Sequence, residues 1–307
     1  MKLNTERIHT IWHLTWPQCI MLLCQFVIGI TDVWAGGRIG SEVQASIGLI
    51  TQCHMMFMAL AMAAVNGAVA SISQSLGACK FVRARRYVGL VTIGCIAVGS
   101  AIAVAASVWR EPLLRLIQTP ESIMPVAIMF LTATIWGIPG QYTLTIGAAV
   151  FRSAKMVLIP LYVTGTACLL NVFGDLAFGL GWWGFPAYGA AGLAYSTLIS
   201  VTVGAALMLF LLMRHGLFTR DSFPGWRWIK AGAPYLLKVA GPAFGTSFLW
   251  QTGYMVLYVI TASLPFGRVN ALAGLTTGLR VESILCLPAV AFSMSASVRV
   301  GHGLGEG

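Results

Sequence analysis

The chain has 307 residues, of which 58% are hydrophobic and 9% are charged, and its mean hydropathy is +0.82. Soluble proteins carry about 25% charged residues, so this composition excludes an ordinary soluble domain and favours a membrane protein with many spans. The formal net charge of +10 would suit a nucleic-acid partner if the basic residues formed one patch. They lie instead in the short segments between apolar runs.

Eight apolar segments reach or exceed the roughly 20 residues that a helix needs to cross a bilayer. We predict membrane helices at 10–36, 45–77, 87–109, 122–151, 156–180, 187–213, 233–262 and 270–300. The predicted fold is therefore all-α and polytopic. Residues 1–213 form an N-terminal lobe of six helices, residues 214–231 a polar cytoplasmic linker, and residues 232–307 the first two helices of an incomplete second lobe.

The basic residues divide unequally between the two sides of the predicted helices. With a cytoplasmic N-terminus, fourteen of the 19 Lys and Arg residues lie inside and five lie outside. The inner set is Lys2, Arg7, Lys80, Arg83, Arg85, Arg86, Arg152, Lys155, Arg214, Arg220, Arg227, Lys230, Lys238 and Arg299, and the outer set is Arg38, Arg110, Arg115, Arg268 and Arg280. Positively charged loops stay in the cytoplasm, so we predict a protein of the inner or plasma membrane with its N-terminus inside. The positive charge is a topology signal, and we expect a lipid bilayer and no nucleic acid as partner.

The first predicted helix carries an acid deep in its apolar sequence. Asp32 follows Gln18, Gln25 and Gly29 at helical spacing, so these four residues share one stripe. A carboxylate in hydrocarbon costs several kcal/mol, and such residues are functional by default. We therefore expect the stripe to form the wall of a polar cavity. Pro17 removes one backbone hydrogen bond near the start of the helix, and we predict a hinge there.

The fifth predicted helix carries a second polar stripe, formed by Thr164, Cys168, Asn171 and Asp175. Asp175 lies about 20 residues from the cytoplasmic turn, in the outer third of the membrane, at a depth similar to that of Asp32. Two buried acids at one depth on two helices are expected to share a site. The alternative is that each acid makes a structural polar contact between helices, and that Asn171 makes a packing contact.

The segment after the linker is similar to the start of the chain. Pro17 has a counterpart in Pro242, Ala45-Ser46-Ile47 recurs as Ala273-Gly274-Leu275, and Gln74-Ser75-Leu76-Gly77 recurs as His302-Gly303-Leu304-Gly305. Internal repeats around a central site are typical of secondary transporters. Both copies begin on the inner side, so the predicted repeat is parallel.

Over nearly its whole length the chain resembles the multidrug and toxic compound extrusion family. The resemblance rests on Pro17 with Asp32, Gln74-Ser75-Leu76-Gly77-Ala78, Asn171 and Asp175 followed by Gly189-Ala190-Ala191-Gly192, and Arg280-Val281-Glu282 with Gly301-His302-Gly303-Leu304-Gly305. It implies two lobes of six helices that export amphipathic, often cationic, compounds in exchange for H⁺ or Na⁺. Because that fold has twelve helices, about four are missing from this sequence, and we expect either a fragment or a truncated gene product.

The resemblance also implies that Asp32, Asn171 and Asp175 hold the coupling ion. We expect the substrate cavity to be lined by Gln18, Gln25, Thr164, Gln251 and Glu282. Some branches of the family carry an acid in the seventh helix, where this chain has only Gln251 in mid-span. We expect no enzymatic activity, no metal and no cofactor beyond the coupling ion. The complete transporter is expected to act as a monomer on a drug-like small molecule.

Other functions remain open at the level of the sequence. A flippase of a related superfamily, which moves lipid-linked oligosaccharides, is the alternative transporter, although its cavity is more cationic. A non-transporting remnant is the alternative if the second lobe is incomplete. An integral-membrane enzyme would need convergent His, Asp or Cys groups, and the five His and nine acidic residues are scattered. Glu282 has a neutralising neighbour in Arg280, and His54 with Met55, Met58 and Met62 is more typical of ordinary packing than of a soft-metal site.

Overall fold

The computed structural model of the protein describes residues 5–116, 119, 121, 123–262 and 268–307. Within the helices it describes the side chains of all residues except 5–10, 255, 258–259, 261–262 and 268–281. The topology residues Lys2, Arg7, Arg268 and Arg280 and the repeat segment 273–275 lie outside the described side chains.

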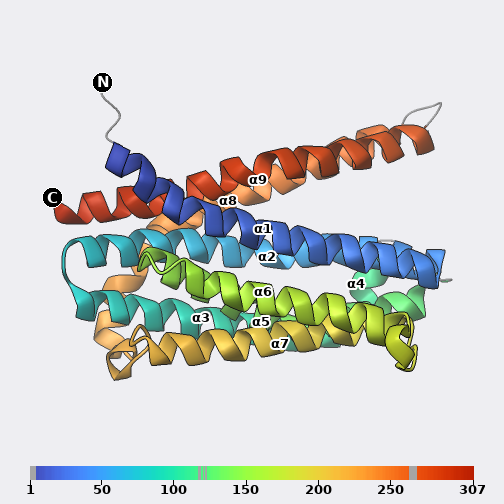
Figure 1. Cartoon of the computed structure of the whole chain (residues 1–307), viewed down its shortest axis with the longest axis horizontal. Helices are drawn as coiled ribbons and strands as arrows, with labels where there is room; N and C mark the ends of the chain where they lie inside the picture. The colour runs from blue at the N-terminus through green and yellow to red at the C-terminus, as the bar shows by residue number, and fades with distance from the viewer. Residues whose placement is uncertain (1–4, 117–118, 120, 122, 263–267) are drawn as a thin grey trace.

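The described chain is helical, which confirms the predicted all-α membrane fold (Figure 1). The long helices are α1 (Thr5–Ile39), α2 (Ser41–Gly77), α3 (Phe81–Val108), α5 (Met124–Ser153), α6 (Leu158–Gly174), α7 (Ala190–Arg214), α8 (Trp226–Ala262) and α9 (Arg268–Glu306). The short elements are α4 (Arg110–Leu116), the π-helical turn η1 (Asp175–Gly179), and the 3₁₀ turns η2 (Trp182–Gly184) and η3 (Arg220–Ser222).

Seven of the described helices are long and apolar enough to cross a membrane. Their apolar portions are Ile11–Ile39, Ser41–Gly77, Phe81–Val108, Met124–Ser153, Leu158–Gly179, Ala190–Arg214 and Glu282–Glu306. The predicted span at 233–262 forms α8 but is not among the seven. Thr246, Ser247, Gln251 and Thr252 interrupt the apolar sequence in its middle.

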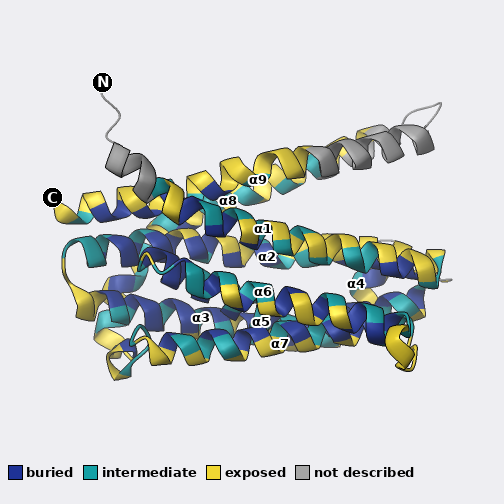
Figure 2. Ribbon diagram, in the orientation of Figure 1, coloured by how far each residue is buried: buried dark blue, intermediate teal, exposed yellow. Residues whose placement is uncertain are grey.

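Helix α5 lies at the centre of the first six long helices and contacts α2, α3, α6 and α7. Ile135, Ile138, Tyr142 and Ile146 on α5 are almost completely buried, and Figure 2 shows buried residues where the helices face one another. In a bilayer, helix association depends on close packing more than on the removal of apolar surface from water. Gly147 illustrates this closeness, because a Cβ there would lie 2.3 Å from Met208 Cγ on α7.

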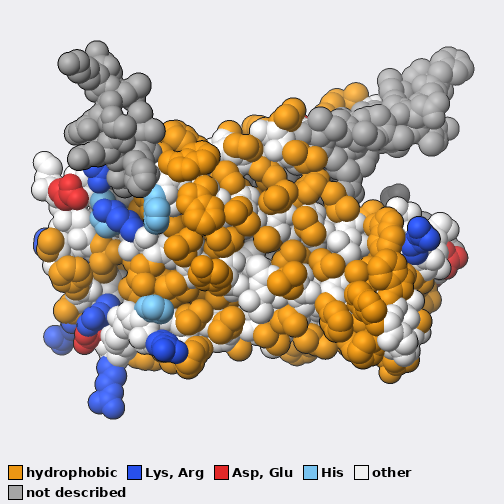
Figure 3. Space-filling view, in the orientation of Figure 1, with side chains coloured by type: hydrophobic (Ala, Val, Ile, Leu, Met, Phe, Trp, Pro, Cys, Tyr) orange, Lys and Arg blue, Asp and Glu red, His pale blue; other side chains and the backbone are white. Residues whose placement is uncertain are grey.

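Charged side chains gather at one end of the bundle. Figure 3 shows apolar side chains over the middle of the molecule and most of the visible Lys and Arg side chains at one end. We call this the basic end and define it by Arg85 near the start of α3, Lys155 just after α5, Arg214 at the end of α7 and Arg299 near the end of α9. The opposite end holds Arg38 and the aromatic loop 181–188. The bundle is therefore charged at its ends and apolar between them, as a membrane protein requires.

The hairpin of α8 and α9 contacts the other helices mainly near the basic end. Gly67 on α2 lies against Leu236 on α8, and His302 Nε2 on α9 lies 2.8 Å from the carbonyl oxygen of Ser153. Farther from the basic end, apolar side chains of the hairpin are exposed: Phe244, Phe248, Leu249, Trp250, Ile284 and Leu285. Figure 1 shows the two helices diverging from α1 and α2 toward the opposite end.

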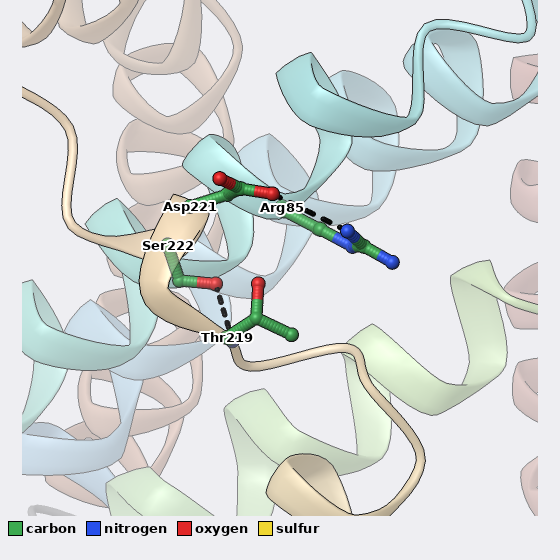
Figure 4. Close-up of polar contacts among 4 residues, drawn as sticks. All are labelled: Arg85, Thr219, Asp221 and Ser222. Atoms are coloured by element: carbon green, nitrogen blue, oxygen red, sulfur yellow. Dashed lines mark hydrogen bonds and ion pairs between the residues drawn. The ribbon is translucent and has the colours of Figure 1, made fainter.

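The segment between α7 and α8 is fixed to the basic end of α3. Arg85 Nη1 pairs with Asp221 Oδ2 at 3.3 Å, and the Thr219 N–H donates to Ser222 Oγ at 3.0 Å (Figure 4). Gly89 makes room for this loop, because a Cβ there would clash with the Ser222 backbone. The predicted linker is thus an ordered turn that leads directly into α8.

Candidate functional site

Asp32 on α1 and Asp175 at the start of η1 face each other. The Asp32 side chain lies next to the side chains of Asp175 and Asn171. Asp175 and Asn171 are 0% exposed, and Asp32 is half-buried. About two helical turns before these acids in the sequence, the same two segments are in contact again. Cys168 Sγ donates to the carbonyl oxygen of Cys24 at 3.5 Å. The structure therefore brings together the three residues that the resemblance marks as the coupling-ion site.

The backbone around Asp175 departs from the α-helical pattern. Asp175 begins the five-residue π-helical turn η1, which continues α6 without a break. The Leu180 N–H donates to the Asp175 carbonyl oxygen at 3.1 Å, a bond that spans five residues. Single π-helical turns are rare and occur frequently at functional sites, because they rotate the side chains that follow.

Two glycines allow α7 to pack directly against this turn. A Cβ at Gly192 would lie 2.3 Å from the carbonyl oxygen of Phe178, and a Cβ at Gly174 would lie 2.3 Å from Ser196 Oγ. Gly189 precedes α7 with a φ of +59°, a left-handed conformation that glycine adopts without strain. The Gly189-Ala190-Ala191-Gly192 segment thus sets the distance between α7 and the acid site.

Asn171 is held in place by α7. Its Nδ2 donates to Thr197 Oγ1 at 3.1 Å, and Ser196 Oγ donates to the Asn171 carbonyl oxygen at 2.9 Å. The Asn171 side chain also lies next to Asp32, so α7 holds it at the acid site. Ser196 and Thr197 were not predicted as site residues. The sequence could have indicated them by their position, because they follow Gly192 on α7 by one to two helical turns.

Four buried oxygen atoms at this site accept no hydrogen bond from the described part of the chain. They are Asp32 Oδ1, both carboxylate oxygens of Asp175 and Asn171 Oδ1. Buried oxygen acceptors without a donor are costly, and two facing carboxylates repel each other. A proton or a small hard cation removes both penalties, since carboxylate and amide oxygens are the ligands that hard cations prefer. The residues present therefore fit a coupling ion of either kind.

The polar stripe of α1 is divided between different surroundings. Gln18 is 0% exposed and lies at the α1–α9 contact, where its Nε2 donates to Ser295 Oγ at 2.8 Å. Gln25 and Gly29 are exposed, and Asp32 lies next to Asn171 on α6. Pro17 is buried beside Gln18. In this conformation Gln18 closes the basic end, whereas Gln25 lies open on the same helix.

The other predicted cavity residues lie on three helices. Thr164 on α6 and Gln251 on α8 are half-buried. Glu282 on α9 is exposed, and its Oε1 accepts a hydrogen bond from Tyr254 at 3.1 Å. Asp32 lies next to Asp175 and Asn171, and no contact among the described residues brings Gln251 or Glu282 to this pair of acids. Within the described chain, then, the geometry separates a compact acid site from the wider set of predicted cavity residues.

Comparisons with known proteins agree with this fold. The MatE family model matches residues 17–176. A probable multidrug resistance protein NorM from Thermotoga maritima is 26% identical over 292 residues, which cover 92% of this chain and 60% of that protein. A FAD transporter from Shewanella oneidensis is 23% identical, with coverage of 95% and 64%. The chain thus spans about three fifths of the length of these curated relatives.

Solved structures show the same architecture. A mutant of the Vibrio cholerae MATE transporter VcmN superposes with a TM-score of 0.87 at 22% identity, covering 97% of this chain and 66% of that chain. A MOP superfamily transporter from Pyrococcus furiosus superposes with a TM-score of 0.86 at 20% identity, covering 97% and 65%. At such identities the likeness shows the fold alone.

Proposed function

Because this chain belongs to the MatE family of multidrug and toxic compound extrusion transporters, we propose that it serves cation-coupled export of amphipathic, cationic small molecules. The coupling ion is H⁺ or Na⁺, and it binds at Asp32, Asn171 and Asp175. The protein works as a monomer in the inner or plasma membrane with a cytoplasmic N-terminus. Residues 1–213 act as one lobe, 214–231 as the linker and 232–307 as part of a second lobe.

The contact between Asp32 and Asp175 is the observation that carries this proposal. A pair of facing carboxylates attracts any cation, whether it is the coupling ion or a positively charged compound in the neighbouring space. When the ion neutralises the pair, the attraction for a cationic compound falls. Binding of the ion and binding of the compound are therefore antagonistic, and by linkage each expels the other. This antagonism is what an antiporter requires.

The contacts of the α8–α9 hairpin support an orientation for the cycle. At the basic end α9 is hydrogen-bonded to α1 and α5, so the helices are in close contact there. Positively charged ends of membrane bundles face the cytoplasm. The conformation described is then closed to the cytoplasm, with the acid site on the outer side of the closure. A cation arriving from outside reaches Asp32 first, since Asp32 is half-buried and Asp175 is fully buried.

The decisive experiment is a competition measurement. Ethidium serves as the lipophilic cation, and its fluorescence anisotropy reports binding to the purified chain in nanodiscs. We expect added Na⁺ or added acid, tested separately in sodium-free buffer, to weaken ethidium binding to the wild-type chain. Whichever treatment acts identifies the coupling ion. Asp32→Asn and Asp175→Asn are expected to remove this competition.

Glu282→Gln is the matched control, because it removes an exposed acid from α9 and leaves the acid pair intact. It is expected to keep the competition. Ethidium binding that is indifferent to both ions, or equal in the wild type and in Asp32→Asn, would contradict the proposal. The flippase alternative predicts preferential binding of an anionic lipid-linked pyrophosphate, which a pair of acids opposes. Competition without ion-driven ethidium transport in proteoliposomes would favour the non-transporting remnant.

A further inference from the structure

Arg152 near the end of α5 is a buried cation. The residue is 6% exposed, and its side chain reaches Gln18 on α1 and Met294 on α9. Nη1 donates to Gln18 Oε1 at 3.4 Å and lies 3.6 Å from Met294 Sδ. The contact with Gln18 is long for a charged donor, and the second acceptor is a weak thioether sulfur. Nε is buried and has no acceptor in the described part of the chain.

No described carboxylate pairs with this guanidinium. Among the described residues, the salt bridge joins Arg85 to Asp221 in the linker. A charge removed from water is costly unless an opposite charge or several hydrogen bonds compensate for it. The environment of Arg152 supplies one amide oxygen and one sulfur, so the side chain is held in place without being neutralised.

Arg152 also lines a cavity of about 320 Å³ between α2, α5, α8 and α9. Its lining includes the polar residues Asn66 and Ser293 and an apolar set, Met62, Val69 and Val239, which we call the apolar wall. Pockets for small organic ligands have volumes of about 300–1,000 Å³, whereas a water molecule occupies about 30 Å³. The cavity therefore has the size of a site for a small organic molecule and exceeds the size of a bare ion.

We propose that this cavity binds an amphipathic oxyanion, which is a carboxylate or phosphate group carried on a small apolar body. A planar oxyanion accepts two parallel bonds from a guanidinium, and the Arg152 side chain lines this cavity. Asn66 and Ser293 donate to the remaining oxygen atoms, and the apolar wall takes the body of the ligand. The ligand is either a soluble compound or the head group of an anionic lipid.

The oxyanion site is separate from the acid site. Gln18, which contacts Arg152, is fourteen residues from Asp32 on α1, or about 21 Å at 1.5 Å per residue. One small molecule cannot span both sites. The cavity also lies between α2 and the α8–α9 hairpin, so an occupant bridges the two parts of the molecule at the basic end. The inference does not rest on the proposed transport function.

Phenyl phosphate is a suitable soluble probe, and isothermal titration calorimetry measures its binding to the purified chain in phosphatidylcholine nanodiscs. We expect Arg152→Gln to weaken binding by at least about tenfold, the effect of losing one charge-assisted bidentate contact. Arg152→Lys keeps the charge but lacks the planar fork, and its affinity is expected to fall in between. Arg299→Gln removes an exposed arginine from the same end and is expected to bind like the wild type.

A second variant tests the cavity without touching the charge. Ala70→Phe fills the space and is expected to abolish phenyl phosphate binding, so the test survives if Arg152→Gln does not fold. Inorganic phosphate is expected to bind more weakly than phenyl phosphate, because it lacks the apolar body. Nanodiscs that contain phosphatidylglycerol identify the source: weakened phenyl phosphate binding there indicates a lipid ligand, and unchanged binding indicates a soluble one. Equal affinity of the wild type, Arg152→Gln and Ala70→Phe would overturn the proposal.

Discussion

Gly77 at the end of α2 lies directly against His302 near the end of α9. A Cβ on Gly77 would lie 2.3 Å from the His302 carbonyl oxygen, and a Cβ on Gly305 would lie 2.3 Å from the Gln74 carbonyl oxygen. The two four-residue segments that the sequence relates as repeats are thus packed reciprocally against each other. This contact between small residues closes the basic end of the bundle.

Gly77→Val should separate the two helix ends. The added side chain meets backbone atoms that cannot move independently, and overpacking of this kind costs about 1–3 kcal/mol. Hydrogen–deuterium exchange of residues 291–306 is expected to accelerate in the variant. Gly303→Val is the matched control, because no atom lies within 4 Å of a Cβ at that position. Equal exchange in both variants would show that the contact does not hold the end closed.

The acid pair leads to a prediction about transport. Asp32→Asn and Asp175→Asn are each expected to abolish ion-driven efflux of a cationic dye from proteoliposomes. The antagonism between the ion and the dye depends on two facing carboxylates, and each variant leaves only one. Insertion into the membrane is expected to be normal. Glu282→Gln is expected to cost less, since Glu282 is exposed and lies on a separate helix. If Glu282→Gln is the most damaging of the three, the assignment of the ion site is wrong.

Ser196 should contribute to the stability of the acid site. Its buried hydroxyl group donates to the Asn171 carbonyl oxygen, and the loss of one such bond costs about 1 kcal/mol. Ser196→Ala is therefore expected to lower the thermal unfolding midpoint by a few degrees. Thr202→Val removes an exposed hydroxyl group from the same helix and is the control. An unchanged midpoint in Ser196→Ala would argue that α7 does not support Asn171 through this bond.

The sequence predicts the positions of the helices better than it predicts which side chains meet between them. The long helices lie within a few residues of most predicted spans, because bilayer thickness and backbone hydrogen bonding leave little freedom. The pairing of Asp32 with Asp175 was predictable from their matching depth. The position of Gln18 was not, because helical spacing says which residues share a face and does not say which helix covers it. In the sequence Arg152 contributes only to the topology signal, since nothing in its local sequence shows that its side chain turns inward.

The last prediction concerns the start of α1. Pro17 has no N–H, so the carbonyl oxygen of His13 lacks its usual helical partner and the helix bends there at low cost. Two hydrogen bonds to α9 flank this point. Thr15 Oγ1 donates to Ser295 Oγ at 3.0 Å, and Gln18 Nε2 donates to the same oxygen at 2.8 Å.

These bonds tie the predicted hinge to the closure of the basic end. Asp32 lies fifteen residues beyond Pro17, about 22 Å along the helix, so a small bend at Pro17 moves it sideways by several ångström. We expect release of Ser295 to free the first turns of α1, and neutralisation of the acid pair to remove the repulsion that opposes a closer approach of α1 to α6. Both events therefore act on one bending motion.

Pro17→Ala restores the missing hydrogen bond and should stiffen α1 without altering either site. Equilibrium ethidium binding is expected to stay within about twofold of the wild type, while the rate of ion-driven efflux falls by at least about tenfold. Ser295→Ala, which removes the common partner of Thr15 and Gln18, is expected to loosen the basic end and leave ethidium binding unchanged. Transport by Pro17→Ala at the wild-type rate would exclude the hinge, and loss of ethidium binding would show that Pro17 shapes the site itself.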